Sequence, residues 1–152
     1  MVISEHLTLA ELIRSESAKR NGISNMPTEE HIANLKLLAE NIFEPIRANF
    51  RCPIFISSGY RSAELNAKIG GASSSQHSFG QAIDIDMDGT NYGVSNSDIF
   101  KYIKDKLPFD QLIWEFGNDK NPDWVHCSYS NRHRKEVLVG YKQDGITYYK
   151  HF

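Results

Sequence analysis

The most informative stretch of the sequence is SSSQHSFGQAIDID, residues 73–86. From residue 80 to residue 89 apolar and acidic side chains alternate, as they do in a half-buried β-strand. The residues before it are rich in serine and include His77, and Gly80 lets the backbone pass close to a small site. We therefore expect His77 on a loop that leads into a strand carrying Asp84.

A third side chain that can bind a metal ion, like those of His77 and Asp84, belongs to His126. It lies in WVHCSY, residues 124–129, which we expect to form a separate strand. Two imidazoles and one carboxylate are a common ligand set for a catalytic zinc ion, with water in the fourth position. Cys127 is the alternative ligand, but neighbouring side chains on a strand point to opposite faces, which favours a buried free thiol. A single histidine of this kind is more commonly a loop or core residue than a metal ligand. Whether His77 and His126 bind a metal therefore depends on the sequence pattern around them.

The rest of the chain alternates between helical and strand patterns. Thr8 and Glu11 form a capping box for a short helix, and a longer helix follows Pro27 with apolar residues from Ile32 to Ile46 at helical spacing. Further helices are expected after Ser62 and over residues 98–106. Strands are expected at 53–60, 80–89, 111–116, 124–129, 135–142 and 146–152, with a hairpin turn at 143–145. This order predicts the α+β class with a largely antiparallel sheet.

Composition sets limits on the class of protein. The chain has 152 residues, which fits a single domain over residues 1–152, and its net charge of −2 indicates no nucleic-acid partner. No stretch is long and apolar enough for membrane insertion, and the N-terminus does not have the pattern of a signal peptide. Two cysteines without a CxxC pair predict no disulfide framework. The basic cluster at Arg132, Arg134 and Lys135 is interpreted as a solvated face.

Residues 75–84 fit the pattern S-x-H-x-x-G-x-A-x-D of the M15 zinc peptidases, which the chain resembles from about Leu7 to about Leu138. SSGYRSAELNAKIGG, residues 57–71, is similar to the family's Y-R-S-x-x-x-N segment. In that family the His and Asp of the pattern bind zinc together with a later His on a strand. The resemblance thus implies a zinc site formed by His77, Asp84 and His126. It also implies the fold shared by the hedgehog domain and the D-Ala-D-Ala peptidases, with zinc in a cleft on an antiparallel sheet flanked by helices.

The carboxylate that moves the proton in such a peptidase has two candidates. Asp123 lies three residues before His126, where several M15 enzymes carry their base, but residues three apart on a strand face opposite sides. Glu115 ends the strand QLIWEF, in a context that resembles the hedgehog domain. A carboxylate on an otherwise apolar strand costs several kcal/mol unless it is compensated. Glu115 is the favoured base, and Asp123 stays open.

Two further residues are candidates for substrate binding. The resemblance implies that Arg61 binds substrate and polarises the scissile carbonyl, a role that suits a permanently charged, forked donor. Ser75 matches a residue that can bind substrate in the family, although a turn hydrogen bond is an equal alternative. Gln111 is a weaker candidate for a residue that hydrogen-bonds to a zinc ligand or the base.

The remaining acidic and histidine residues carry no expected site. Asp84, Asp86 and Asp88 would share a strand face, but no EF-hand pattern is completed, and a solvated strand end is the preferred interpretation. His6, His31, His133 and His151 are interpreted as surface residues.

The resemblance implies a zinc hydrolase that cuts stem peptides of bacterial peptidoglycan, as a D-Ala-D-Ala carboxypeptidase or as an L-alanyl-D-glutamate endopeptidase of the phage endolysin type. We expect a monomer, made without a signal peptide in the cytoplasm of a cell or of a phage-infected host, that acts on the cell wall. The alternative is a non-catalytic zinc-binding module on the same scaffold, such as a virion or tail component.

Overall fold

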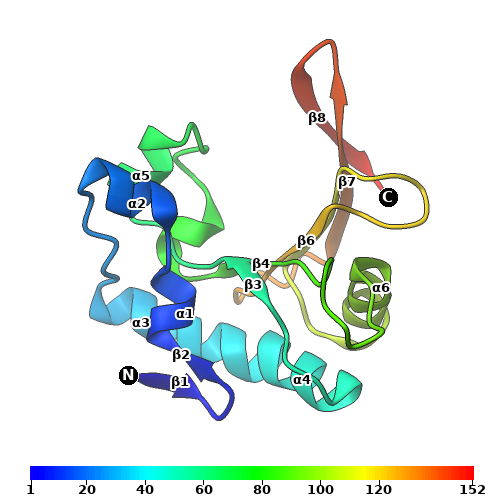
Figure 1. Ribbon diagram of the computed structural model, residues 1–152, viewed down its shortest axis with the longest axis horizontal. Helices are drawn as coiled ribbons and strands as arrows, with labels where there is room; N and C mark the ends of the chain where they lie inside the picture. Colours follow the sequence, from blue (N-terminus) through cyan, green and yellow to red (C-terminus); the bar gives the residue numbers. More distant parts are fainter.

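The computed structural model describes residues 1–152 and is built around a mixed six-stranded sheet. The strands of this sheet are β3 (Ile56–Ser58), β4 (Ala82–Ile85), β5 (Gln111–Glu115), β6 (Trp124–Ser128), β7 (Glu136–Gln143) and β8 (Ile146–His151). Their order across the sheet is β3-β4-β6-β5-β7-β8. The hairpin of β7 and β8 extends away from the helices (Figure 1). A separate hairpin of β1 (Val2–Ser4) and β2 (Leu7–Thr8) stands at the N-terminus.

The sheet is antiparallel except at one pair, so the expectation of an antiparallel sheet is only partly correct. β5 and β7 run parallel, with Glu115 opposite Gly140. The reason is the order of the strands. β6 already has β4 on one edge and β5 on the other, so the chain crosses to the free edge of β5 before it forms β7. The last hairpin turns at Asp144 and Gly145, both with positive φ, as the sequence predicts.

The helices begin where side chains cap them. Thr8 and Glu11 form the expected capping box. The short helix expected after Thr8 is present and ends where Arg14 is extended; Ser15 then caps a second short helix that the sequence analysis did not predict. No helix of the structure combines the length and the apolar character needed to span a membrane. The helices are α1 (Leu9–Ile13), α2 (Glu16–Asn21), α3 (Glu29–Leu38), α4 (Glu44–Phe50), α5 (Ala63–Lys68) and α6 (Asn96–Lys106), with a π-helix η1 (Ala39–Phe43) and a 3₁₀ helix η2 (Gln76–Phe79).

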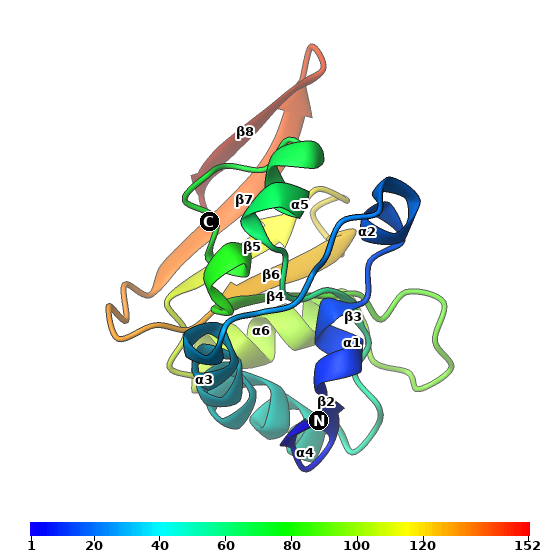
Figure 2. The ribbon, with the colours of Figure 1, turned by 90° about the vertical axis from the view of Figure 1, so that its left-hand side faces the viewer.

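The long helix expected after Pro27 is continuous in the structure, as α3, η1 and α4. Its apolar residues Leu35, Leu38, Ile42 and Ile46 are almost fully buried, which confirms the helical spacing in the sequence. The π-helix η1 in its middle has wider turns, which shift the spacing of the apolar residues without interrupting the helix. Together with α6, this segment packs against the sheet and encloses the core (Figure 2).

The alternation of side chains along the strands separates the core from the opposite face of the sheet. The residues of β4, β5 and β6 that join the core cluster are Ile83, Ile85, Leu112, Trp114, Val125 and Cys127. The residues between them face the other way, and they include Asp84, Glu115 and His126. The fold therefore places the polar residues of three adjacent strands on the face away from α6.

Candidate metal centre

Asp84 and His126 are cross-strand neighbours. Their Cα atoms are paired in the antiparallel ladder between β4 and β6, which puts both side chains on the same face. His126 Nδ1 lies 3.0 Å from Asp84 Oδ1. Two residues that are 42 positions apart in the chain are thus brought together by strand register alone.

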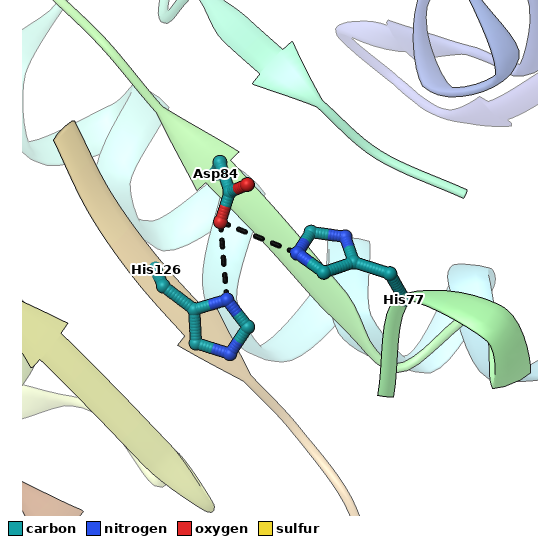
Figure 3. A group of neighbouring side chains, drawn as sticks. All are labelled: His77, Asp84 and His126. Carbon is teal, nitrogen blue, oxygen red and sulfur yellow. Dashed lines mark hydrogen bonds and ion pairs between the residues drawn. The ribbon is translucent and has the colours of Figure 1, made fainter. Parts of the chain in front are cut away.

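His77 reaches the same carboxylate from η2. Gly80 ends this turn with a φ of 72°, and a Cβ there would lie 2.4 Å from the His31 carbonyl oxygen, so only glycine fits. His77 Nε2 lies 3.3 Å from Asp84 Oδ1 (Figure 3). On the other side of the ring, Nδ1 lies 2.7 Å from the Gly59 carbonyl oxygen. Because a carbonyl only accepts, Nδ1 carries the proton and Nε2 presents its lone pair to the site.

The three side chains fit a metal ion. Their ligand atoms all lie within 4.8 Å of one another, and His77 and Asp84 are buried. Atoms bound to zinc at about 2.0 Å in a tetrahedron are roughly 3.3 Å apart, close to the 3.0 and 3.3 Å measured at Asp84. Burial alone would raise the pKa of Asp84, but the two imidazoles outweigh it and hold the pKa well below its usual range. The site therefore presents an ionised carboxylate and two imidazoles to a cation.

The three residues open into a pocket of about 780 Å³. Its lining includes most of the other candidates from the sequence and one residue that the sequence did not single out: Arg61, Ser75, Gln111, Glu115 and Tyr149. The loop at 70–76, β5 and the β7–β8 hairpin supply its walls.

The structure places the two candidate carboxylates differently. Glu115 is 5% exposed and lines the pocket, and burial raises its pKa to about 7, with His126 acting in the opposite direction. Asp123 is exposed and lines a different pocket, and its backbone N–H donates to the Glu115 carbonyl oxygen at 2.9 Å. The strand alternation that places Trp124 and His126 in the metal pocket turns Asp123 away from it.

Arg61 and Ser75 lie beside His77. The Arg61 backbone N–H donates to the His77 carbonyl oxygen at 3.2 Å, and its Nη2 lies 3.5 Å from Ser75 Oγ. Arg61 Nε is buried and has no acceptor within the protein. Ser75 also caps η2, since its Oγ accepts from the His77 backbone N–H at 3.3 Å. Both alternatives for Ser75, a turn hydrogen bond and a place in the pocket, thus occur together.

The carboxylate of Asp110, which the sequence analysis did not single out, is buried and links the segment around Gln76 to the segment around Arg134. Asp110 is fully buried, and its oxygens accept from Arg134 Nε at 2.9 Å and from Gln76 Nε2 at 2.9 Å. Burial would raise the pKa of Asp110, but Arg134, Gln76 and Ser130 outweigh it and hold the pKa well below its usual range. Arg134 is therefore part of an ion pair, not only of a solvated face. The sequence signal for this ion pair was an Asp directly before the strand at residue 111 and the arginines at 132 and 134.

Gln111 lines the pocket, and its Nε2 donates to Glu136 Oε1 at 2.7 Å. No hydrogen bond joins it to a zinc-ligand candidate or to Glu115.

Asp86 and Asp88 do not continue the strand face of Asp84, because β4 ends at Ile85. Asp86 Oδ1 instead accepts from the Asp88 backbone N–H and from Asn96 Nδ2, both at 3.0 Å. These hydrogen bonds are those of a turn after a strand.

His31 is not the surface residue that the sequence indicates. It is partly buried, with its Nδ1 3.0 Å from the Tyr60 hydroxyl. Its ring packs between Tyr60 and Phe79. His6 is more exposed and contacts Glu44, which links the N-terminal hairpin to α4.

Cys127 points into the core as a free thiol, as expected. Burial raises its pKa well above the ordinary value for a thiol, so the thiolate that a metal requires is disfavoured.

Comparison with known proteins identifies the family of this chain. No curated protein matches the chain. The family model described as Peptidase M15 matches residues 5–128, a range that includes His77, Asp84, Glu115 and His126 and ends before β7. With that match over most of its length and the pocket described above, the chain belongs to the M15 family of peptidases.

Proposed function

We propose that this protein is a zinc peptidase that hydrolyses a peptide bond in the stem peptides of bacterial peptidoglycan. The observation that carries the proposal is the convergence of His77, Asp84 and His126 in one pocket whose wall also holds a buried carboxylate, Glu115. M15 peptidases are generally zinc-dependent, and this donor set suits zinc. Zinc, when bound by these three residues, supplies a Lewis acid that polarises the scissile carbonyl and lowers the pKa of water.

Glu115 is the proposed general base. A base works best when its pKa lies near the working pH, and burial brings that of Glu115 to about 7 without metal. The carboxylate takes a proton from the attacking water and then gives it to the leaving amine. Its position at the end of β5, in the strand next to His126, keeps it on the same side of the sheet as the metal ligands.

Arg61 is the proposed substrate anchor. It is held beside His77 by backbone hydrogen bonding, and its guanidinium has donor capacity that the protein does not use. Burial lowers its pKa, and Asp84 partly offsets that shift. A guanidinium stays charged under these conditions and donates through a fixed fork to a carbonyl or carboxylate of the substrate. Ser75, 3.5 Å from Arg61 Nη2, sits on the same wall.

Both candidate bonds, D-Ala-D-Ala and L-Ala-D-Glu, are accessible to this chemistry, and the products distinguish them. Purified zinc-loaded protein is incubated with peptidoglycan, and the fragments are identified by mass spectrometry. Release of free D-alanine indicates the carboxypeptidase, and a new N-terminal D-glutamate indicates the endopeptidase. We expect His77→Ala and Asp84→Ala to abolish both zinc retention and cleavage. His151→Ala, a matched change at an exposed histidine outside the pocket, should leave both intact. Zinc binding without cleavage of any stem peptide contradicts the proposal and favours a non-catalytic module.

A further inference from the structure

The β7–β8 hairpin lies beyond the residues that match the family, yet it reaches the metal pocket. Glu115 on β5 is paired with Gly140 on β7, and Gly140 is paired with Tyr149 on β8. The three residues form one row across the sheet, on the face that holds the metal ligands. Tyr149 lines the pocket at the end of this row.

Gly140 is what allows Glu115 and Tyr149 to meet. A Cβ at residue 140 would lie 3.0 Å from Glu115 Oε2 and 2.9 Å from Tyr149 Cε1. The two side chains therefore converge above the glycine, which places the Tyr149 ring next to the Glu115 carboxyl. Burial and the nearby charge of Glu115 raise the pKa of the Tyr149 phenol, which favours the protonated form, the form that can donate a hydrogen bond.

The fold itself does not require this tyrosine. Every residue of β8 is exposed, and Tyr149 is 51% exposed and belongs to no core cluster. The neighbouring Tyr148 points to the other face, where it stacks on Tyr141 with ring centroids 5.7 Å apart. Tyr149 thus contributes little packing, yet its ring lies next to the buried Glu115 carboxyl and both residues line the metal pocket.

We propose that Tyr149 is a positioning residue for Glu115: its hydroxyl holds one carboxylate oxygen and leaves the other free to take the proton from water. This inference rests on the proposed function of Glu115 as the base. A carboxylate that rotates freely presents a lone pair to the water only part of the time, and one donated hydrogen bond removes that freedom. The hairpin thus completes an active site whose metal ligands come from the family-matched part of the chain.

The test is Tyr149→Phe, which removes the hydroxyl and keeps the ring. We expect kcat on a stem peptide to fall about tenfold, with KM, bound zinc and Tm unchanged. Tyr148→Phe is the matched control on the opposite face and leaves kcat at the wild-type value. A Tyr149→Phe enzyme with wild-type kcat, or one in which only KM changes, overturns the inference.

A second measurement separates this inference from the proposed function. In metal-free protein at fixed pH, the ¹³C resonance of the Glu115 side-chain carboxyl should move in Tyr149→Phe and stay in place in Tyr148→Phe. An unchanged resonance in Tyr149→Phe refutes the contact even if the protein cleaves peptidoglycan. A shifted resonance in a protein that cleaves no stem peptide shows that the contact exists and that the proposed function has failed.

Discussion

Gly140→Ala should lower activity while leaving the fold intact. The added Cβ would lie 3.0 Å from Glu115 Oε2, whereas an ordinary contact is 3.4–4 Å, so the carboxylate has to move by a few tenths of an ångström. Misplacing a catalytic group by about 1 Å costs about a hundredfold in rate, so a displacement of this size should cost about tenfold, or ~1.4 kcal/mol in the barrier. Gly140 lacks a positive φ, so alanine adopts its backbone without strain, and lower entropy of the unfolded chain offsets the contact by about 0.5–1 kcal/mol.

The assay compares kcat on a stem peptide with the free energy of unfolding in urea and with bound zinc. The matched control is Gly145→Ala in the hairpin turn, where φ is +75° and nothing lies within 4 Å of the new Cβ. Strain there should cost about 1 kcal/mol of stability and leave kcat unchanged, which is the reverse pattern. A Gly140→Ala protein with wild-type kcat would refute the reasoning, and so would a loss of activity that merely follows a loss of stability or zinc.

The other predictions concern the proposed zinc site, the proposed base Glu115, the proposed substrate anchor Arg61 and the buried ion pair of Asp110. Zinc at a thousandfold excess over its Kd should stabilise the protein by about 4 kcal/mol, or roughly 8–16 °C in Tm by calorimetry, and His77→Ala should show no zinc-dependent shift. Glu115→Gln should lower kcat about a thousandfold. Glu115→Gln should also raise the free energy of unfolding of metal-free protein in urea at pH 8 by about 1–3 kcal/mol, because burial raises the pKa of Glu115 from 4.5 to about 7 and the ionised carboxylate destabilises the native state as pH rises. At pH 4 the wild type and Glu115→Gln should be equally stable. Higher stability of the variant at pH 4 would contradict the raised pKa of Glu115. Arg61→Lys should lower kcat/KM about tenfold or more with zinc content unchanged, since an ammonium cannot donate as a fork; full activity argues against the anchor. Asp110→Asn should cost about 3 kcal/mol at pH 7. The depressed pKa of Asp110 means that this stability is present above about pH 4 and is lost as pH falls below it, so the gap in urea midpoints should close in acid; a gap independent of pH counts against the ion pair.

Local patterns in the sequence predict much of this fold correctly. The capping box at Thr8, the buried stripe from Leu35 to Ile46 and the turn at Asp144 and Gly145 depend on neighbours within a few positions, and all three are present. The mistakes lie where distant parts of the chain compete. The parallel pair of β5 and β7 depends on which sheet edge is free, and the partly buried His31 depends on Tyr60 and Phe79 packing around it.

For the site, the sequence by itself indicated the three donor residues and predicted that His126 and Cys127 point to opposite faces of their strand. The motif at residues 75–84 and the place of His126 in WVHCSY already indicate His77, Asp84 and His126 as candidates. Only the tertiary structure decided which carboxylate shares their pocket and which residue contacts it. Glu115 belongs to the pocket, and Asp123 does not, because β5 and β6 pair in one register. Tyr149 meets Glu115 because β7 joins the free edge of β5 with a glycine in the row between them. Pairing between strands that are not neighbours in the sequence brings distant residues together, and the pattern of one strand does not say which strand becomes its partner.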